Sequence, residues 1–253
     1  MHIAVWFGLA AVVLVFLALD LRSARHQRPV SVRRAAVQSA GWLAAGLAFA
    51  LVVLVSAGGQ AAASYLTVFG LEKALSLDNV AVLAVVVTAL GLSPRGEKHL
   101  VTAGLLAAVP LRIGFILAGL ALVSALHWAL YVFGAVLVLS GVQMLRHRSA
   151  EPGLASDGLA MRLLGRLSPG GRHQRARLLA GGLAVAAADV LFAIDSIPAA
   201  LAVTRDAELV IAANVLAVLG LRPLYTLLAA GMQQLAYLRA GLAVLLLGMG
   251  AKL

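Results

Sequence analysis

Long apolar runs constrain this chain more than any other feature of its sequence. Residues 3–19 and 100–123 are examples of runs long enough to cross a bilayer of roughly 30 Å as helices. Of the 253 residues, 62% are hydrophobic and only 12% are charged, whereas a soluble domain of this size needs far more polar surface. The sequence therefore predicts an all-α fold, that of a polytopic membrane protein.

The apolar pattern predicts about eight transmembrane helices, with boundaries good to a few residues. They cover residues 3–19, 41–55, 61–90, 100–123, 127–145, 178–204, 209–230 and 235–251. We divide the chain into four parts accordingly. These are two N-terminal helices in residues 1–60, a first three-helix repeat in 61–145, a basic cytoplasmic linker in 146–177 and a second three-helix repeat in 178–253.

The distribution of basic residues predicts the orientation. The first apolar run is followed by Arg22, Arg25 and Arg28, the reverse of a signal peptide, so it reads as a retained helix with its N-terminus outside. The loops then predicted to be cytoplasmic hold fifteen of the twenty lysines and arginines, as the positive-inside rule requires. We expect a multi-pass protein of a bacterial inner membrane, whose net charge of +10 reflects topology and not nucleic-acid binding.

Two similar acidic motifs indicate an internal repeat. Glu72 precedes Asp78 and Asn79 by the same spacing with which Asp189 precedes Asp195 and Ser196. Further on, residues 104–112 match residues 214–222, and both stretches end in arginine. Each copy holds three helices, an odd number, so the copies enter the membrane from opposite sides. Such inverted repeats are typical of secondary transporters, with the substrate site at the repeat interface.

Four of the ten acidic residues fall inside apolar spans: Glu72, Asp78, Asp189 and Asp195. Each ionised side chain at the bilayer centre costs about 2.5–3.5 kcal/mol, so four of them cost on the order of 10 kcal/mol. They therefore need partners that offset this cost. Ion pairs are one alternative, with the bases Lys73, Arg112 and Arg222. Three bases leave one acid over, which a cation or exchangeable protons would satisfy. Carboxylate, amide and hydroxyl oxygens suit hard ions such as Mn²⁺, Mg²⁺ or Ca²⁺.

Helix geometry predicts a broken helix at the acidic motifs. Residues six apart on a straight helix lie roughly 120° apart around its axis, so Glu72 and Asp78 could not both face one ion. Pro198 removes a backbone donor and frees the carbonyl of Ile194, and freed carbonyls serve as cation ligands in discontinuous helices. A simple kink at Pro198 is the alternative, because membrane helices tolerate proline.

Other chemistry finds little support in the sequence. The absence of cysteine excludes disulfides and thiolate sites, and no phosphate-binding glycine motif is present, so transport would run on gradients. No nucleophile–base pair or zinc-type cluster appears. We therefore expect neither an enzyme nor a bound cofactor, and no catalytic residues.

The chain resembles the TerC/Alx family of bacterial membrane proteins. The likeness rests on residues 71–79, 189–198 and 214–222 and covers nearly the whole chain. It implies manganese export and metal homeostasis, with links to tellurium resistance and the response to alkaline pH. Similar proteins tend to carry a glutamate where this chain has Ala186. By motif, the resemblance implies a metal site formed by Glu72, Asp78, Asn79, Asp189, Asp195 and Ser196.

Three functions are compatible with these observations. The leading one is a secondary transporter that exports Mn²⁺, so that its partners are a divalent metal ion and the lipid bilayer. A second keeps the fold but moves another cation such as Ca²⁺. A third is a membrane scaffold that transports nothing and assists metal loading or tellurite resistance. Assembly as a homo-oligomer stays open.

Overall fold

The computed structural model describes residues 31–126, 128–146 and 174–231, and these residues form helices without strands. The helices are α2 (Val32–Leu90), α3 (Pro94–Ala125), α4 (Ala129–Arg146), α6 (Gln174–Val203), α7 (Ala207–Leu219) and α8 (Leu221–Gly231). The all-α prediction is confirmed for this part of the chain. The predicted helices 3–19 and 235–251, and most of the predicted linker, lie outside the described residues.

Several of these helices are long and apolar enough to cross a membrane. Three stretches qualify by length and composition, namely Val32–Ser76, Gly96–Ala125 and Leu178–Val203, and the bent pair α7–α8 makes a fourth if it is one span. Leucine and valine side chains on their outer surfaces are exposed, among them Leu51, Val55 and Leu179. Large apolar side chains are exposed in this way on a bundle that faces lipid, whereas the surface of a bundle that faces water is polar. The described residues thus belong to an integral membrane protein.

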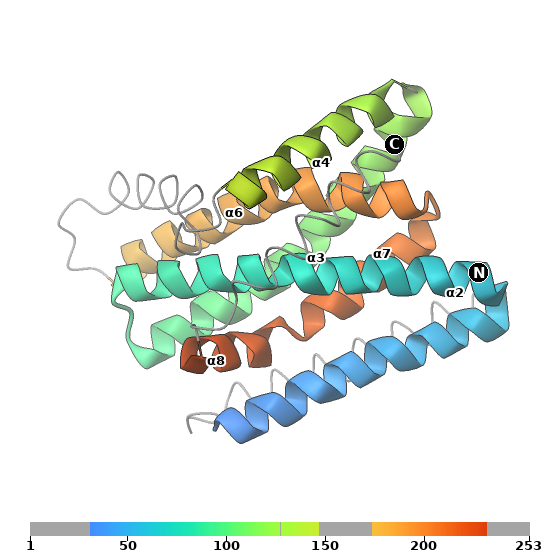
Figure 1. The fold of residues 1–253 in the computed structure, drawn as a ribbon. Coiled ribbons are helices and arrows are strands. Elements are labelled where there is room, and N and C mark those ends of the chain that lie inside the picture. The colour runs from blue at the N-terminus through green and yellow to red at the C-terminus, as the bar shows by residue number, and fades with distance from the viewer. Residues whose placement is uncertain (1–30, 127, 147–173, 232–253) are drawn as a thin grey trace.

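Gly58 folds α2 back on itself. Its φ of 87° lies in the left-handed region that glycine adopts without strain, so the helix splits here into two arms. The arms run side by side (Figure 1), and the Tyr65 hydroxyl of the second arm donates to the Gly46 carbonyl of the first at 3.0 Å. These arms correspond to the predicted helices 41–55 and 61–90.

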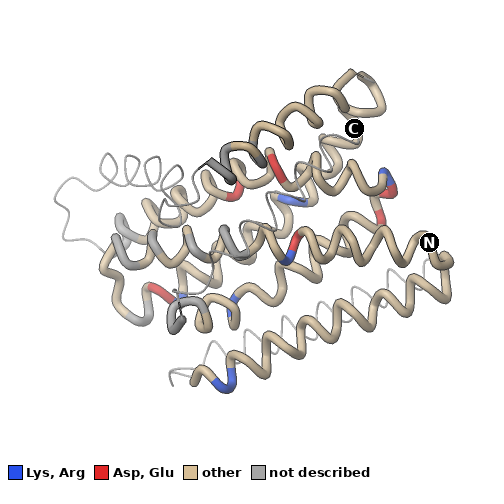
Figure 2. Tube along the Cα trace, viewed as in Figure 1, with Lys and Arg blue, Asp and Glu red and all other residues tan. Residues whose placement is uncertain are grey.

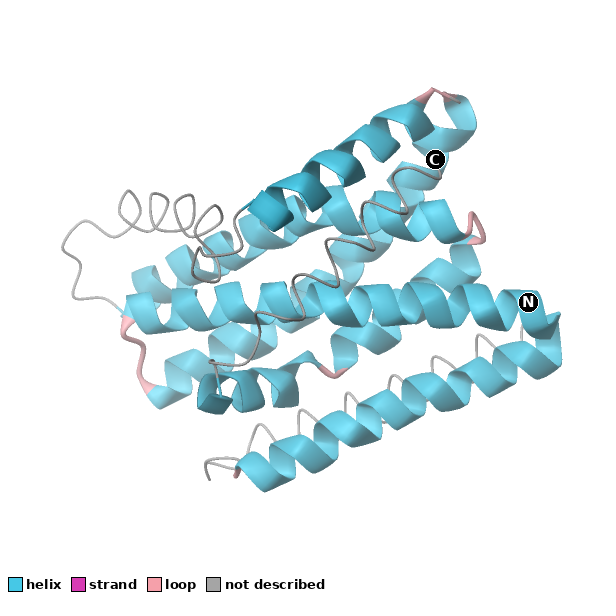
Figure 3. Ribbon diagram, viewed as in Figure 1, coloured by secondary structure: helices cyan, strands magenta, loops and turns pink. Residues whose placement is uncertain are grey.

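The second arm of α2 is the centre of the bundle. It packs against α6, α7 and α8, while α3 contacts α6 and α7 and α4 covers α6. Figure 3 shows that the short loop before α3 lies at one end of the bundle, whereas the loops after α3 and before α7 lie at the other. The loop after α3 and the kink at Gly58 therefore share the end opposite to the connections that the sequence predicts to be cytoplasmic.

Helix α6 runs antiparallel to the second arm of α2, with the two acidic motifs at one level. Leu71 of α2 shares a small hydrophobic cluster with Ala199 of α6. Farther along, Val86 of α2 shares a second cluster with Ala184 of α6. Both motifs lie between these two contacts on their own helices, so the antiparallel packing brings the motifs side by side.

The predicted break at Pro198 is wrong. Helix α6 continues through Pro198, and the second arm of α2 is likewise helical from Glu72 to Asp78. The proline removes one backbone donor, but the packed neighbours of α6 keep the helix together. The break lies instead between α7 and α8 at Gly220, where the axis bends by 40° within the predicted helix 209–230.

Two helix starts are fixed by capping side chains. The Ser93 hydroxyl accepts from the Gly96 backbone N–H, and Pro94 occupies the first turn of α3, where a missing N–H costs nothing. The Asp206 carboxylate accepts from the N–H groups of Glu208 and Leu209 at the start of α7. The loops before α3 and α7 are short because of these caps.

The contact between the two arms of α2 yields a prediction. A Cβ at Gly46 would overlap the ring of Phe69, whereas one at Gly41 on the same arm meets nothing within 4 Å. We expect Gly46→Ala to lower stability by about 1–3 kcal/mol, because the buried ring has to move. Gly41→Ala, the matched control, should be neutral. The readout is thermal unfolding of the purified protein in detergent, and equal unfolding temperatures for both variants would contradict this packing.

Candidate functional site

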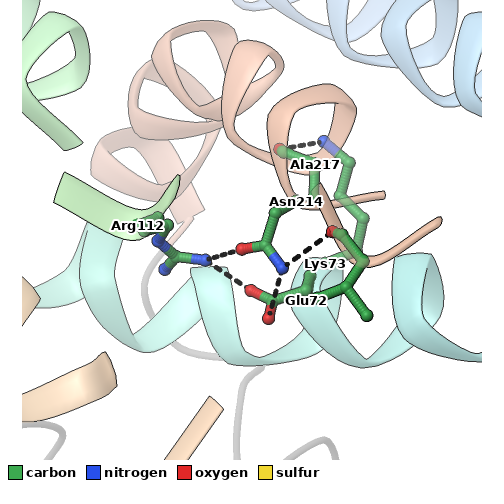
Figure 4. Close-up of polar contacts among 6 residues, drawn as sticks. Glu72, Lys73, Arg112, Asn214 and Ala217 are labelled. Carbon is green, nitrogen blue, oxygen red and sulfur yellow. Dashed lines mark hydrogen bonds and ion pairs between the residues drawn. The ribbon is translucent and has the colours of Figure 1, made fainter. Parts of the chain in front are cut away.

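A buried carboxylate lies where α2, α3 and α7 meet. The side chain of Glu72 is 1% exposed, and Arg112 of α3 and Asn214 of α7 beside it are also buried. The Arg112 guanidinium forms an ion pair with Glu72 Oε2 and donates to Asn214 Oδ1 at 3.1 Å. Asn214 Nδ2 donates to Glu72 Oε1 at 3.0 Å (Figure 4). Each of the three side chains contacts the other two, and we call them the Glu72 network.

The carboxylate of Glu72 and the amide of Asn214 each have hydrogen-bond partners for both of their polar atoms. Asn214 Nδ2 also donates to the Val210 carbonyl one turn earlier in α7, at 3.3 Å. Both carboxylate oxygens of Glu72 therefore accept a hydrogen bond, and the positive charge of Arg112 offsets the negative one. A buried ion pair needs this additional hydrogen bonding, because desolvation costs several kcal/mol per ion. A hollow lined by Arg112, Asn214 and neighbouring valines is too narrow to admit a water molecule.

Lys73, the residue after Glu72, contacts the end of α7 and not the Glu72 network. Its ammonium donates to the Ala217 carbonyl at 2.8 Å, in the last turn of α7 before the break. A carbonyl at a helix end lacks an intrahelical donor, and a lysine can supply one. A Cβ at Gly220 would lie 2.6 Å from Lys73 Nζ and 3.0 Å from the Trp42 Cβ, so the break leaves room for this contact. In the described structure Lys73 is a helix cap and not an ion-pair partner.

The second acidic motif lies on α6. Asp189 is buried, and the Arg112 guanidinium interacts electrostatically with its carboxylate as well. Ser196 is 2% exposed, and Asp195 is half-buried. Asp189 and Ser196 are seven residues apart on a continuous helix, so they share one face of α6. Arg112 thus pairs with Glu72 directly and acts on Asp189 only through its charge.

The rest of the first motif is described in part. Asn79 is half-buried, and its Oδ1 has no hydrogen-bond partner; the buried Ser76 Oγ lacks one too. The side chain of Asp78 lies outside the described residues. Among the side chains that are described, no group of three His, Asp or Glu could hold a metal ion. The six-residue metal site that the sequence suggested therefore stays a prediction.

The sequence missed the role of Asn214. It entered the sequence comparison only as the start of a repeated stretch, yet it is the single strongly polar residue in the middle of α7, whose neighbours are alanine, valine and leucine. An amide in such a helix needs a partner, and that signal was available. The role of Arg112 as a charge partner was among the alternatives considered. Figure 2 shows how few charged positions lie inside the bundle, away from the helix ends.

Comparisons with known proteins agree with each other. The profile of the "Integral membrane protein TerC family" matches residues 57–253. A membrane protein of Myxococcus xanthus is 35% identical over 98% of this chain and 82% of its own. The membrane-bound redox modulator Alx of Escherichia coli K12 is 33% identical over 98% of this chain and 84% of its own. No solved structure matches this chain.

The Glu72 network yields a prediction about stability. Arg112→Gln should lower stability by about 3–5 kcal/mol, because it leaves a buried carboxylate without its counter-charge. The double variant Glu72→Gln/Arg112→Gln should recover much of that loss, since neither charge remains to be compensated. Arg205→Gln, which changes an exposed loop arginine, is the matched control and should unfold like the wild type. Unfolding temperatures in detergent are measured for the wild type, Glu72→Gln, Arg112→Gln, the double variant and the control. Simple additivity of the two single changes would contradict the coupling.

Proposed function

This chain belongs to the TerC family of integral membrane proteins, and from that premise we propose that it is a secondary transporter that exports a divalent metal cation, with Mn²⁺ as its cargo. The proposal adopts the predicted topology: a bacterial inner-membrane protein of about eight helices with its N-terminus outside. Two inverted repeats would supply one acidic helix each. The ion would bind where these helices meet.

The observation that carries the proposal is the pairing of the two acidic motifs. Antiparallel packing of α2 on α6 brings them to one level of the bundle, between the cluster that holds Leu71 and Ala199 and the cluster that holds Val86 and Ala184. Acidic residues inside membrane spans are expensive and mark ion pathways. The two motifs hold four acidic residues against three bases in the neighbouring sequence, so we expect a surplus of negative charge that favours a cation.

The contacts of the described residues favour different roles for the first and the second acid of each motif. The single positive charge of Arg112 is paired with Glu72, and it acts on Asp189 only electrostatically, without an ion pair. We propose that the second acids, Asp78 and Asp195, supply charge that offsets dehydration of the ion, because they occupy equivalent positions in the two motifs. Asn79 and Ser196 follow them in the sequence and offer neutral oxygen atoms. A set of carboxylate, amide and hydroxyl oxygens suits Mn²⁺ better than soft ions.

The energy source in this proposal is an ion gradient. The sequence holds no nucleotide-binding motif, so export would be driven by a coupled ion such as the proton. The relative in Escherichia coli is named a redox modulator. Because this chain contains no cysteine, we propose that any comparable effect here arises from the level of a metal ion and not from thiol chemistry.

The proposal predicts which substitutions abolish export. Asp78→Asn and Asp195→Asn each keep the side-chain volume and one carbonyl oxygen but remove the charge, so each should reduce manganese tolerance to that of cells without the protein. Insertion should be normal, because a neutral side chain is cheaper to bury in a bilayer. The measurement is growth on Mn²⁺ of a strain that lacks its own exporters, with protein levels checked in isolated membranes.

Asp206→Asn is the matched control. It also exchanges aspartate for asparagine, but at an exposed helix start where asparagine caps equally well, so tolerance should be unchanged. Full tolerance from both the Asp78 and Asp195 variants would rule out a carboxylate metal site and favour the scaffold. A panel of metals separates Mn²⁺ export from Ca²⁺ export.

A further inference from the structure

Ser76 is a buried hydroxyl that nothing in the described structure uses. Its side chain is fully buried, and Oγ has no hydrogen-bond partner. A serine inside a helix normally donates to the carbonyl one turn earlier, but this one does not. Leaving a buried hydroxyl unpaired costs about 1–3 kcal/mol relative to a satisfied one. Such a group calls for a partner that the described part of the chain does not provide.

The position of Ser76 on α2 indicates what kind of partner it lacks. Ser76 follows Glu72 by four residues and precedes Asn79 by three, a spacing that places all three on one face of a continuous helix. Asn79 Oδ1, like Ser76 Oγ, has no hydrogen-bond partner among the residues that the structure describes. A carboxylate and two unused neutral oxygens therefore form a row along the second arm of α2, at the level of the acidic motif of α6.

We propose that Glu72, Ser76 and Asn79 form a row of oxygen ligands along which a hard divalent cation passes, and that the Ser76 hydroxyl is the central ligand. This inference rests on the proposed function and adds a ligand position to it. Arg112 occupies the Glu72 end in this conformation, through its ion pair. A cation that advances along the row would take over the Glu72 carboxylate from Arg112. The hydroxyl bridges the distance between the carboxylate and the amide, because one helical turn is about 5.4 Å.

The lack of native cysteine makes a direct test available. Ser76→Cys would carry the only thiol in the chain, so every labelling event reports this position. We expect a small, charged thiol reagent to modify it in membrane vesicles, and Mn²⁺ to slow that reaction about tenfold or more, because the ion occupies the row. Ala184→Cys is the matched control: Ala184 is equally buried but lies in an apolar cluster of α6, and should stay unmodified.

Transport in the same vesicles separates a ligand from a merely structural serine. Ser76→Ala should raise the Mn²⁺ concentration for half-maximal export about tenfold, and Ser76→Thr, which keeps the hydroxyl, should restore it. Export by Ser76→Cys should become sensitive to Cd²⁺, because a thiolate prefers a soft ion.

Three outcomes would overturn the inference: no modification of Ser76→Cys, modification that Mn²⁺ does not slow, or unchanged export by Ser76→Ala. Each of these, with active wild-type protein, refutes the ligand row alone. Wild-type vesicles that move no divalent cation refute the proposed function instead.

Discussion

The burial of Glu72 is the constraint on which the centre of this bundle depends. A carboxylate that is 1% exposed inside a membrane protein requires a counter-charge and hydrogen bonds to both oxygens. Arg112 of α3 and Asn214 of α7 supply them, so three helices that are distant in sequence must meet at one point. The pairing of α2 with α6 brings the second acidic motif to the same level, next to the same arginine.

The residue after Glu72 imposes a second constraint on the same helices. Lys73 caps the end of α7 through the Ala217 carbonyl, and Gly220 leaves space for its ammonium where α7 gives way to α8. Glu72 therefore holds the middle of α7 through Asn214, and Lys73 holds the end of α7 next to the bend.

The class of fold and the buried acid Glu72 could be predicted from the sequence, because long apolar runs and a charge inside one of them are strong signals. The two arms of α2 were predicted as the separate helices 41–55 and 61–90, but the turn at Gly58 was not. The break was misplaced at Pro198, since a proline is visible in a sequence, whereas the space that Lys73 needs at Gly220 depends on the packing of α2 against α7. Asn214 was missed because its partners lie 142 and 102 residues away, on other helices.

The central claim is that a hard divalent cation binds between the two acidic motifs. The most direct test is a structure of the purified protein with Mn²⁺, in which anomalous scattering at the manganese edge locates the ion independently of the protein atoms. We expect a peak between α2 and α6, within bonding distance of Asp78 and Asp195, that disappears in the Asp78→Asn variant. A manganese peak elsewhere, or none at a concentration that saturates export, would contradict it.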